Sequence, residues 1–376
     1  MPPYPWIWAK LMDSRRKFIK TCLYCALSGW GAAVLPAASA CNKREGNPSL
    51  LDTGDLGRRE KATQIAPAQI DPDFEPPYLA LHRSGELEKR GKELWNIMKS
   101  CELCPRECGV DRIGGDKGFC QASSQLEVAS FHPHFGEERP LVGKGGSGTV
   151  FFSNCNLRCV FCINWEISQG GMGSPRSIDD VAEMMLKLQK MGCPNINVVT
   201  PSHYPAHIVL ALDKAAEQGL RIPLVYNTCG WEKIETLKTL DGIVDIYLPD
   251  FKYASGDMAA KYSSDSRSYP ELTKAGLLEM HRQVGTARPA ADGLMYRGLM
   301  IRHLVMPNQV GGTKEIITWI AKNLPKDTYV NIMSQYRPMY KAFDYPKIAR
   351  RLTREEYEDA VKWAKDAGLT NLDIQG

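Results

Sequence analysis

Three cysteines in one short stretch carry the clearest chemical signal in the sequence. Cys155, Cys159 and Cys162 follow one another with the spacing C-x3-C-x2-C. Thiolate sulfur is the soft ligand that iron takes in iron–sulfur clusters, so three thiols on one loop favour such a cluster. Structural zinc fits less well because it takes four ligands, and no fourth Cys or His stands close by. Four irons on three cysteines would leave one iron open to a substrate or cofactor.

The elements that must position these cysteines follow from the apolar pattern. The β-branched and aromatic run from Thr149 to Phe152 predicts a buried strand that leads directly into the cysteine loop. Beyond it, strand-like and helix-like segments alternate, which predicts an α/β fold with a parallel sheet. Strands are expected over residues 149–154, 195–200, 222–228, 244–251, 297–306 and 328–334. Helices are expected over residues 178–191, 205–218, 231–240, 271–285, 312–323 and 353–367.

The cysteine loop resembles the cluster motif of a large enzyme superfamily. An aromatic residue, Phe161, stands before the last cysteine, and the motif follows the first strand of the alternating region. This pattern is similar to that of the radical S-adenosylmethionine (radical SAM) enzymes. The resemblance implies a 4Fe–4S cluster on the three cysteines, SAM on the open iron and Phe161 near the SAM adenine. Six βα units are too few to close an eight-stranded barrel. We therefore expect a partial (β/α)6 TIM-like barrel of radical SAM type over residues 149–376, preceded by a small Cys-rich metal-binding module over 91–148.

Polar residues stand at the ends of several expected strands, where ligands bind in parallel sheets. Asn227 and Thr228 end the third strand, Asp250 and Lys252 follow the fourth, and Arg302 lies in the fifth. Asp250 and Lys252 are two residues apart, so they face the same side of a strand. An acid beside a base suits the ammonium and carboxylate groups of an amino acid. A salt bridge that caps a barrel strand is the alternative interpretation.

Longer stretches resemble the uncharacterised relatives of pyruvate formate-lyase activating enzyme. They span roughly residues 95–376. The matching stretches are Cys-Glu-Leu-Cys-Pro-Arg-Glu-Cys-Gly-Val, Phe-Phe-Ser-Asn-Cys-Asn-Leu-Arg-Cys, Tyr-Leu-Pro-Asp-Phe-Lys-Tyr, Ile-Arg-His-Leu-Val-Met-Pro and Met-Ser-Gln-Tyr-Arg-Pro. The resemblance implies that Asp250 and Lys252 lie at the methionyl end of SAM. It also carries the roles of cofactor-binding residues to Asn227, Thr228 and Arg302.

One departure from the radical SAM pattern concerns the SAM ammonium group. Radical SAM enzymes usually carry Gly-Gly-Glu after the second strand, whereas residues 199–204 read Val-Thr-Pro-Ser-His-Tyr. With no glutamate there, we expect the backbone near Thr200, together with Asp250, to hold the ammonium.

Two functions are compatible with these residues. The first is an enzyme that cleaves SAM reductively to a 5′-deoxyadenosyl radical, which abstracts hydrogen from a substrate. The activating-enzyme resemblance implies a protein or peptide glycine as that substrate and a flavodoxin or ferredoxin as reductant. The second is an exported iron–sulfur or zinc protein that transfers electrons or binds a partner without cleaving SAM.

A second cysteine group precedes the barrel. Cys101, Cys104, Cys108 and Cys120 lie within twenty residues, and the glycine-rich turn at 114–118 can bring the last back to the first three. Four thiolates suit either a closed zinc site or an auxiliary iron–sulfur cluster. In an exported protein, disulfide pairing is a third possibility.

The N-terminus has the layout of a targeting segment. Arg15 and Arg16 precede an apolar stretch that ends in small residues, so residues 1–40 resemble a twin-arginine export signal. Export to the periplasm or cell envelope is expected, although function in the cytoplasm, where SAM is made, is not excluded. Cys41 could carry a lipid, so the signal and this cysteine are the only expected membrane contacts. Residues 41–90 are rich in Gly, Pro and charged residues and predict a largely irregular linker.

Composition sets broad limits on the partners. The 376 residues carry a net charge of +4, and the basic residues are not concentrated in one run. Nucleic-acid binding needs a strong basic patch, so we expect no nucleic-acid partner.

Overall fold

The computed structural model describes residue 71 and residues 73–374, all of which lie in one compact unit that begins at Thr63. The expected signal over 1–40, the lipid site at Cys41 and most of the expected linker lie outside the described residues. These three expectations therefore stay predictions.

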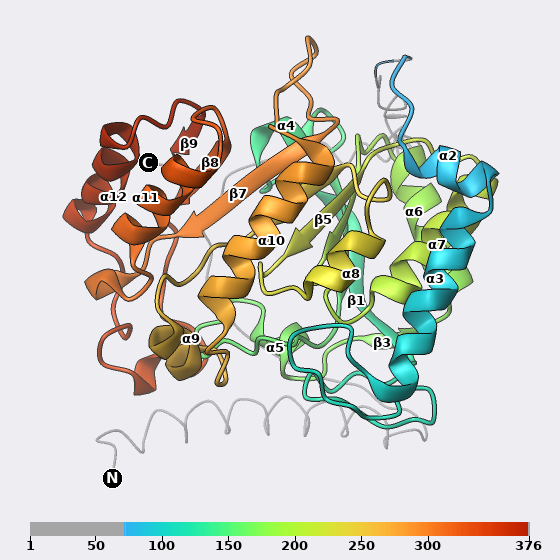
Figure 1. Ribbon diagram of the computed structural model, residues 1–376, viewed down its shortest axis with the longest axis horizontal. Coiled ribbons are helices and arrows are strands. Elements are labelled where there is room, and N and C mark those ends of the chain that lie inside the picture. The colour runs from blue at the N-terminus through green and yellow to red at the C-terminus, as the bar shows by residue number, and fades with distance from the viewer. Residues whose placement is uncertain (1–70, 72, 375–376) are drawn as a thin grey trace, which may run out of the picture. The chain divides into compact units, whose positions relative to one another are not determined.

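A nine-stranded sheet forms the centre of the described chain, with strand order β3-β1-β2-β4-β5-β6-β7-β8-β9 (Figure 1). Six neighbouring strands, β2 to β8 without β3, are parallel and are the six that the apolar pattern predicts. Their observed bounds are β2 Ser147–Phe152, β4 Ile196–Val199, β5 Leu224–Thr228, β6 Ile246–Pro249, β7 Gly298–Leu304 and β8 Tyr329–Met333. The α/β prediction is confirmed, and the arrangement is consistent with a partial barrel.

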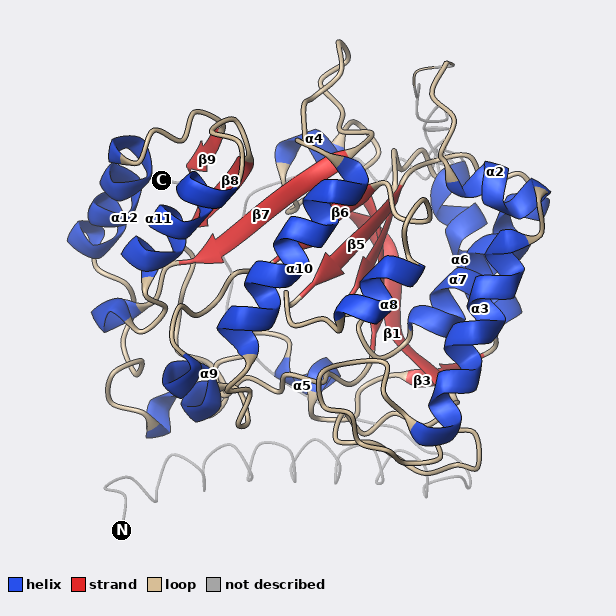
Figure 2. Ribbon diagram, viewed as in Figure 1, coloured by secondary structure: helices blue, strands red, loops and turns tan. Residues whose placement is uncertain are grey.

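Helices connect these strands and lie outside the sheet (Figure 2). All six predicted helices are present, with ends that move by a few residues, as α6 Ile178–Lys190, α7 Pro205–Glu217, α8 Ile234–Thr239, α10 Tyr269–Val284, α11 Thr313–Asn323 and α12 Arg354–Asp366. Two of the starts are fixed by capping boxes. Ser177 and Asp180 exchange hydrogen bonds at the start of α6, and Thr353 and Glu356 do so at α12.

Three strands and several short elements were not expected from the sequence. β1 (Leu126–His134) pairs antiparallel with β2, and β3 (Ser174–Arg176) pairs antiparallel with β1. β9 (Leu372–Ile374) adds a parallel strand beside β8. The unexpected helices are α4 Arg139–Val142, α5 Trp165–Ser168 and α9 Gly256–Tyr262, with 3-10 turns at Met98–Ser100, Pro307–Gln309 and Ala342–Asp344. β1 lies within residues 91–148 and belongs to the central sheet, and the Cys-rich metal-binding module expected over these residues stays a prediction.

The end of the expected linker is helical rather than irregular. α2 spans Tyr78–Arg83 and α3 spans Glu86–Ile97, so the prediction of irregular structure up to residue 90 was wrong here. Leu87 and Leu94 of α3 are fully buried, and Gly91 lets the helix approach Leu210 of α7. The charged residues that predicted a linker are the solvent face of this amphipathic helix.

None of the helices in the described residues combines the length and apolar character needed to cross a membrane.

Candidate active site

The three-cysteine loop follows β2 directly and turns tightly at the carboxyl end of the parallel sheet. Cys155 and Cys159 are buried and Cys162 is partly buried. Asn154 and Arg158 take left-handed backbone conformations, with φ of 75° and 50°, and these reverse the chain between the cysteines. All three are free thiols.

Each of the three sulfurs accepts one hydrogen bond, as an iron-bound thiolate does. The donors are the Leu157 amide to Cys155 at 3.4 Å, the Ser263 hydroxyl to Cys159 at 3.0 Å and the Ser168 hydroxyl to Cys162 at 3.3 Å. Burial raises the pKa of Cys159 to about 12, and the Lys252 ammonium opposes this shift only in part. Iron bound at this sulfur would favour the thiolate form.

The donor set of the loop fits an iron–sulfur cluster. Its three free thiols are the soft ligands that cluster irons take, and each would bind a different iron. Cys155, Cys159 and Cys162 would hold such a cluster and leave its fourth iron open.

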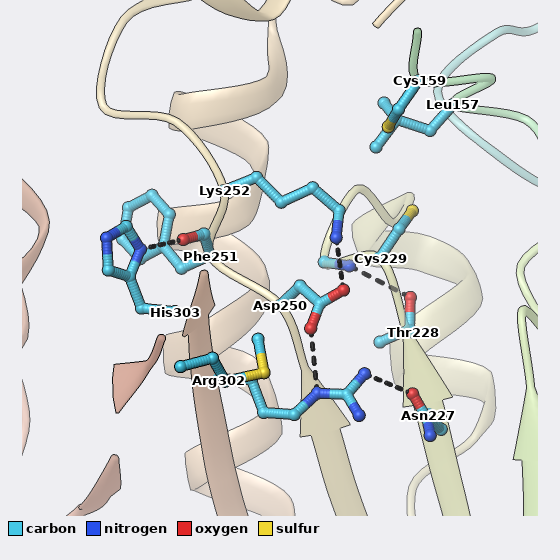
Figure 3. Close-up of polar contacts among 12 residues, drawn as sticks. Leu157, Cys159, Asn227, Thr228, Cys229, Asp250, Phe251, Lys252, Arg302 and His303 are labelled. Carbon is cyan, nitrogen blue, oxygen red and sulfur yellow. Dashed lines mark hydrogen bonds and ion pairs between the residues drawn. The ribbon is translucent and has the colours of Figure 1, made fainter. Parts of the chain in front are cut away.

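Charged residues from two neighbouring strands meet beside this loop (Figure 3). Lys252 forms an ion pair with Asp250, and the Arg302 Nε donates to the other Asp250 oxygen at 2.9 Å. All three side chains are at most 15% exposed. Arg302 also donates to the Asn227 side-chain oxygen at 2.6 Å. The structure thus joins four of the residues singled out by the sequence into one network.

The charges in this network stabilise one another. Burial alone would raise the pKa of Asp250, but the Arg302 and Lys252 cations outweigh burial and lower it. Burial would likewise lower the pKa of Lys252, yet Asp250 raises it to about 12. All three groups are therefore charged at neutral pH. Such an enclosed pair of cations around one acid can bind the carboxylate and ammonium of an amino acid.

The network continues into the barrel through two acids that the sequence did not single out. Glu137 accepts hydrogen bonds from Arg302 at 3.2 Å, Asn197 at 2.7 Å and Asn227 at 3.3 Å. Its neighbour Glu138 is 4% exposed, and burial raises its pKa to about 7. In the sequence, these residues are only a pair of acids before Arg-Pro. That pattern does not indicate where their loop lies in the fold.

Thr228 and Thr200 occupy positions different from those of Asn227. Thr228 faces away from its neighbour Asn227, as alternate strand residues do, and donates to Glu232. Thr200 is held through its backbone, with φ of 60° and its amide bonded to the Asn227 carbonyl at 3.0 Å. The side-chain hydrogen bond of Thr228 therefore goes to Glu232 and not to the Asp250 network.

A glutamate from another loop reaches the segment that lacks Gly-Gly-Glu. Glu232 accepts hydrogen bonds from Ser202 and Thr228 and is fully buried. Burial raises the pKa of Glu232 to about 7, against the effect of both hydroxyl groups. The sequence did not predict this contact, because Glu232 is distant in sequence from residues 199–204.

Phe161 lies in an aromatic cluster beside the cysteine loop. Its ring centroid is 6.4 Å from that of Tyr253 and 6.0 Å from that of Tyr336. Tyr253 is hydrogen-bonded at 2.8 Å to Ser263, the residue that donates to Cys159. This places an apolar, planar surface next to the expected cluster.

The second cysteine group gathers around a loop rather than on a strand. Cys101, Cys104 and Cys120 are buried, and Cys108 is partly exposed. All four are free thiols, so the disulfide interpretation is not supported.

Comparison with known proteins connects this geometry to a family. The model of the radical SAM superfamily matches residues 149–275, which include the cysteine loop and Asp250 with Lys252. The chain is 35% identical over 282 residues to the uncharacterised protein MJ0674 of Methanocaldococcus jannaschii, covering 73% of this chain and 77% of that protein. It is 24% identical to the uncharacterised protein MJ0808 of the same organism, over 68% of this chain and 78% of that one.

The chain belongs to the radical SAM superfamily. Members of this superfamily use a 4Fe–4S cluster and SAM, and the three-cysteine loop has the donor set for such a cluster. That SAM is held by Phe161, Thr200, Asn227, Thr228, Asp250, Lys252 and Arg302 stays a prediction.

Proposed function

We propose that this radical SAM protein is an enzyme that binds SAM against Asp250, Lys252 and Arg302 and abstracts hydrogen from a substrate. The observation that carries the proposal is the buried charge network beside the three-cysteine loop, at the carboxyl ends of parallel strands. When bound, the cluster supplies the electron that splits SAM into methionine and a 5′-deoxyadenosyl radical.

The residues of this chain have the following roles in the proposal. The Lys252 and Arg302 cations bind the SAM carboxylate, and Asp250 accepts hydrogen bonds from the SAM ammonium. Before SAM arrives, these three groups satisfy one another, which avoids an unpaired buried charge. Phe161 and its aromatic neighbours give the adenine an apolar surface and keep water away from the reacting atoms.

We also propose a protein or peptide glycine as the substrate and a flavodoxin or ferredoxin as the electron donor. The activating-enzyme-like stretches support this part. Large apolar side chains are exposed close to the cysteine loop, at Ile163 and Met172. Phe343 is also exposed, and it lies near the loop because the Lys341 amide donates to the Val160 carbonyl. Exposed apolar groups around a reactive site are suited to contact with another protein.

We propose export by the twin-arginine route, since that route carries folded proteins with cofactors already inserted. The support is the sequence of residues 1–40 alone. Localisation of the native protein with and without Arg15→Lys and Arg16→Lys would test this part separately from the chemistry.

The proposal is tested by SAM cleavage in the full chain, reconstituted with iron and sulfide without oxygen. With dithionite and SAM, we expect 5′-deoxyadenosine and methionine from the wild type and none from Cys162→Ala. Lys252→Ala should lose about tenfold or more in the rate at low SAM, because a charge-assisted hydrogen bond is removed. Lys187→Ala, on the exposed face of α6, is the matched control and should cleave SAM normally.

The second candidate function predicts a different result. The missing Gly-Gly-Glu favours an iron–sulfur protein that transfers electrons without cleaving SAM. An intact cluster that yields no 5′-deoxyadenosine, and whose electron paramagnetic resonance (EPR) spectrum does not change with SAM, would support it and overturn the enzyme proposal.

A further inference from the structure

We propose that Cys101, Cys104, Cys108 and Cys120 bind a second iron–sulfur cluster, adjacent to the first and closed by four cysteine ligands. Its presence does not depend on the proposed function. Its role as a relay for the electron does rest on that function.

The antiparallel pairing of β1 with β2 brings the two cysteine groups to the same end of the sheet. Val128, near the start of β1, is paired with Phe152, the last residue of β2. Cys120 stands before β1 and Cys155 stands after β2, so both leave the sheet at that end. The loops between α3 and β1 lie beside α5 at the end to which the β5 and β7 arrows point (Figure 1). A parallel neighbour for β2 would have placed them at opposite ends.

Asn156 and Arg106 connect the two groups directly. Asn156 follows Cys155 in the first loop and is fully buried. The Nε of Arg106, which stands two residues after Cys104, donates to the Asn156 carbonyl at 3.0 Å. This hydrogen bond places the Arg106 guanidinium beside both cysteine groups.

Tight turns bring the cysteines of the second group together. The amide of Gly109, next to Cys108, donates to the Cys101 carbonyl at 3.1 Å. A methyl group at Gly118 would make ordinary van der Waals contact with two of the sulfurs, 3.4 Å from that of Cys108 and 3.8 Å from that of Cys120. The sulfurs of Cys108 and Cys120 therefore lie close to each other.

Backbone and side-chain donors face these sulfurs, as they do in the first loop. The Phe119 amide donates to the Cys108 sulfur at 3.3 Å, and Arg112 donates to the Cys101 sulfur at 3.7 Å. Arg112 is 1% exposed, so its contact with the Cys101 sulfur is enclosed by the protein. Hydrogen bonds to sulfur adjust the reduction potential of iron–sulfur clusters.

The placement of the ligands favours a cluster over zinc. Zinc holds four sulfurs at about 2.3 Å, which puts them roughly 3.8 Å from one another. The hydrogen bond from Arg106 to the Asn156 carbonyl places the second group beside the first loop. An iron–sulfur cluster at that place can exchange electrons with the first cluster, whereas zinc has no redox chemistry.

The proposed relay consists of two one-electron transfers. A low-potential one-electron donor reduces the second cluster, which is then reoxidised as it reduces the first cluster by one electron. Cys108, the partly exposed member, marks the side that is open to a donor. No bond is formed or broken in either transfer, and no proton moves.

Metal content of the full chain, assembled without oxygen, tests the proposal. We expect about eight irons and eight sulfides per wild-type chain, and about four of each when Cys155, Cys159 and Cys162 are all replaced by Ala. The four irons retained in that variant should give an EPR signal that SAM does not change. Cys193→Ala removes a buried cysteine outside both groups and should retain about eight irons.

Replacement of the cysteines of the second group provides the complementary experiment. Ala at all four of its cysteines should leave about four irons, whose EPR signal SAM alters. If this variant fails to fold, the variant of the first group decides the question alone. A wild-type chain with about four irons and one zinc, or a first-group variant without iron, would overturn the second cluster. Eight irons without SAM cleavage would instead contradict the proposed function and leave this inference standing.

Discussion

The acids of the site differ in charge because their surroundings differ. Asp250 stands between two cations, which lower its pKa, whereas Glu232 accepts only hydroxyl groups, and burial raises its pKa to about 7. Asp250 was predictable because strand ends in parallel sheets bind ligands, and an acid and a base stood two residues apart there. Glu137 and Glu232 were not predictable, because their roles depend on where loops distant in sequence come to rest. A single sequence gives no signal for contacts between such distant loops.

The raised pKa of Glu232 predicts an unusual pH dependence of stability. Between about pH 5 and pH 7, the folded chain retains a proton that the unfolded chain has released, so the free energy of unfolding falls as pH rises. Glu232→Gln removes this effect. From about pH 5 to pH 8, the wild type should lose on the order of 3 kcal/mol relative to the variant. Urea unfolding at a series of pH values measures this difference.

Glu235→Gln provides the control, since Glu235 is exposed on the following helix. Its stability should follow the wild type at every pH. Parallel curves for the wild type and Glu232→Gln would show that Glu232 is charged in the folded chain, contrary to this expectation.

At the scale of elements, the parallel strands of the sheet were predictable from the sequence. The elements added around them were not. The six core strands are buried on both faces and read as short apolar runs, which alternate with amphipathic helices. β1 was not predicted as a strand because it contains Ser130, two histidines and Pro133, and the local sequence around these residues favours a loop. Pairing with β2 overrides those preferences. The start of α3 was assigned to the linker because its exposed face carries most of its charge.

The turn after β5 depends on a glycine that brings two strand ends together. Gly230 has φ of +83°, and a methyl group there would lie 2.0 Å from the Asp250 carbonyl oxygen. We expect Gly230→Ala to lower the free energy of unfolding by about 3 kcal/mol or more and to weaken SAM binding, because Asp250 must move. Denaturant unfolding and SAM titration measure the two effects.

Gly285→Ala separates backbone strain from the clash. Gly285 has a similar φ of +73°, with no neighbouring atom in the way. Its ψ of −166° lies in a region that glycine alone adopts readily, so its replacement should cost about 1 to 3 kcal/mol from strain alone. Equal losses for the two variants would mean that the contact with Asp250 does not matter.

At the scale of the molecule, the described chain folds around one principal core. Buried residues of α3, the cysteine loops and the barrel belong to the same apolar cluster. The described residues also lie within one compact unit. A change in α3 should therefore reach the site through cooperative unfolding rather than through a local effect.

Leu94→Ala tests this cooperativity. Leu94 is fully buried between α3 and its neighbours, so its truncation should cost about 3 kcal/mol. The loss should appear as one transition, with far-ultraviolet circular dichroism and iron release shifted together. Leu278→Ala, at a position 45% exposed, should cause little change. Separate transitions for the two signals would show that α3 unfolds independently of the barrel.

The two outermost strands bear on how copies of the chain behave at high concentration. β3 and β9 are only three residues long, and Pro175 in β3 has no amide hydrogen to offer. An open sheet whose borders were long and regular would be a template for strands of other molecules. Here the borders present few unpaired amides, which limits growth of mixed sheets between copies. The short strands at the two edges of the sheet therefore also protect the protein against aggregation.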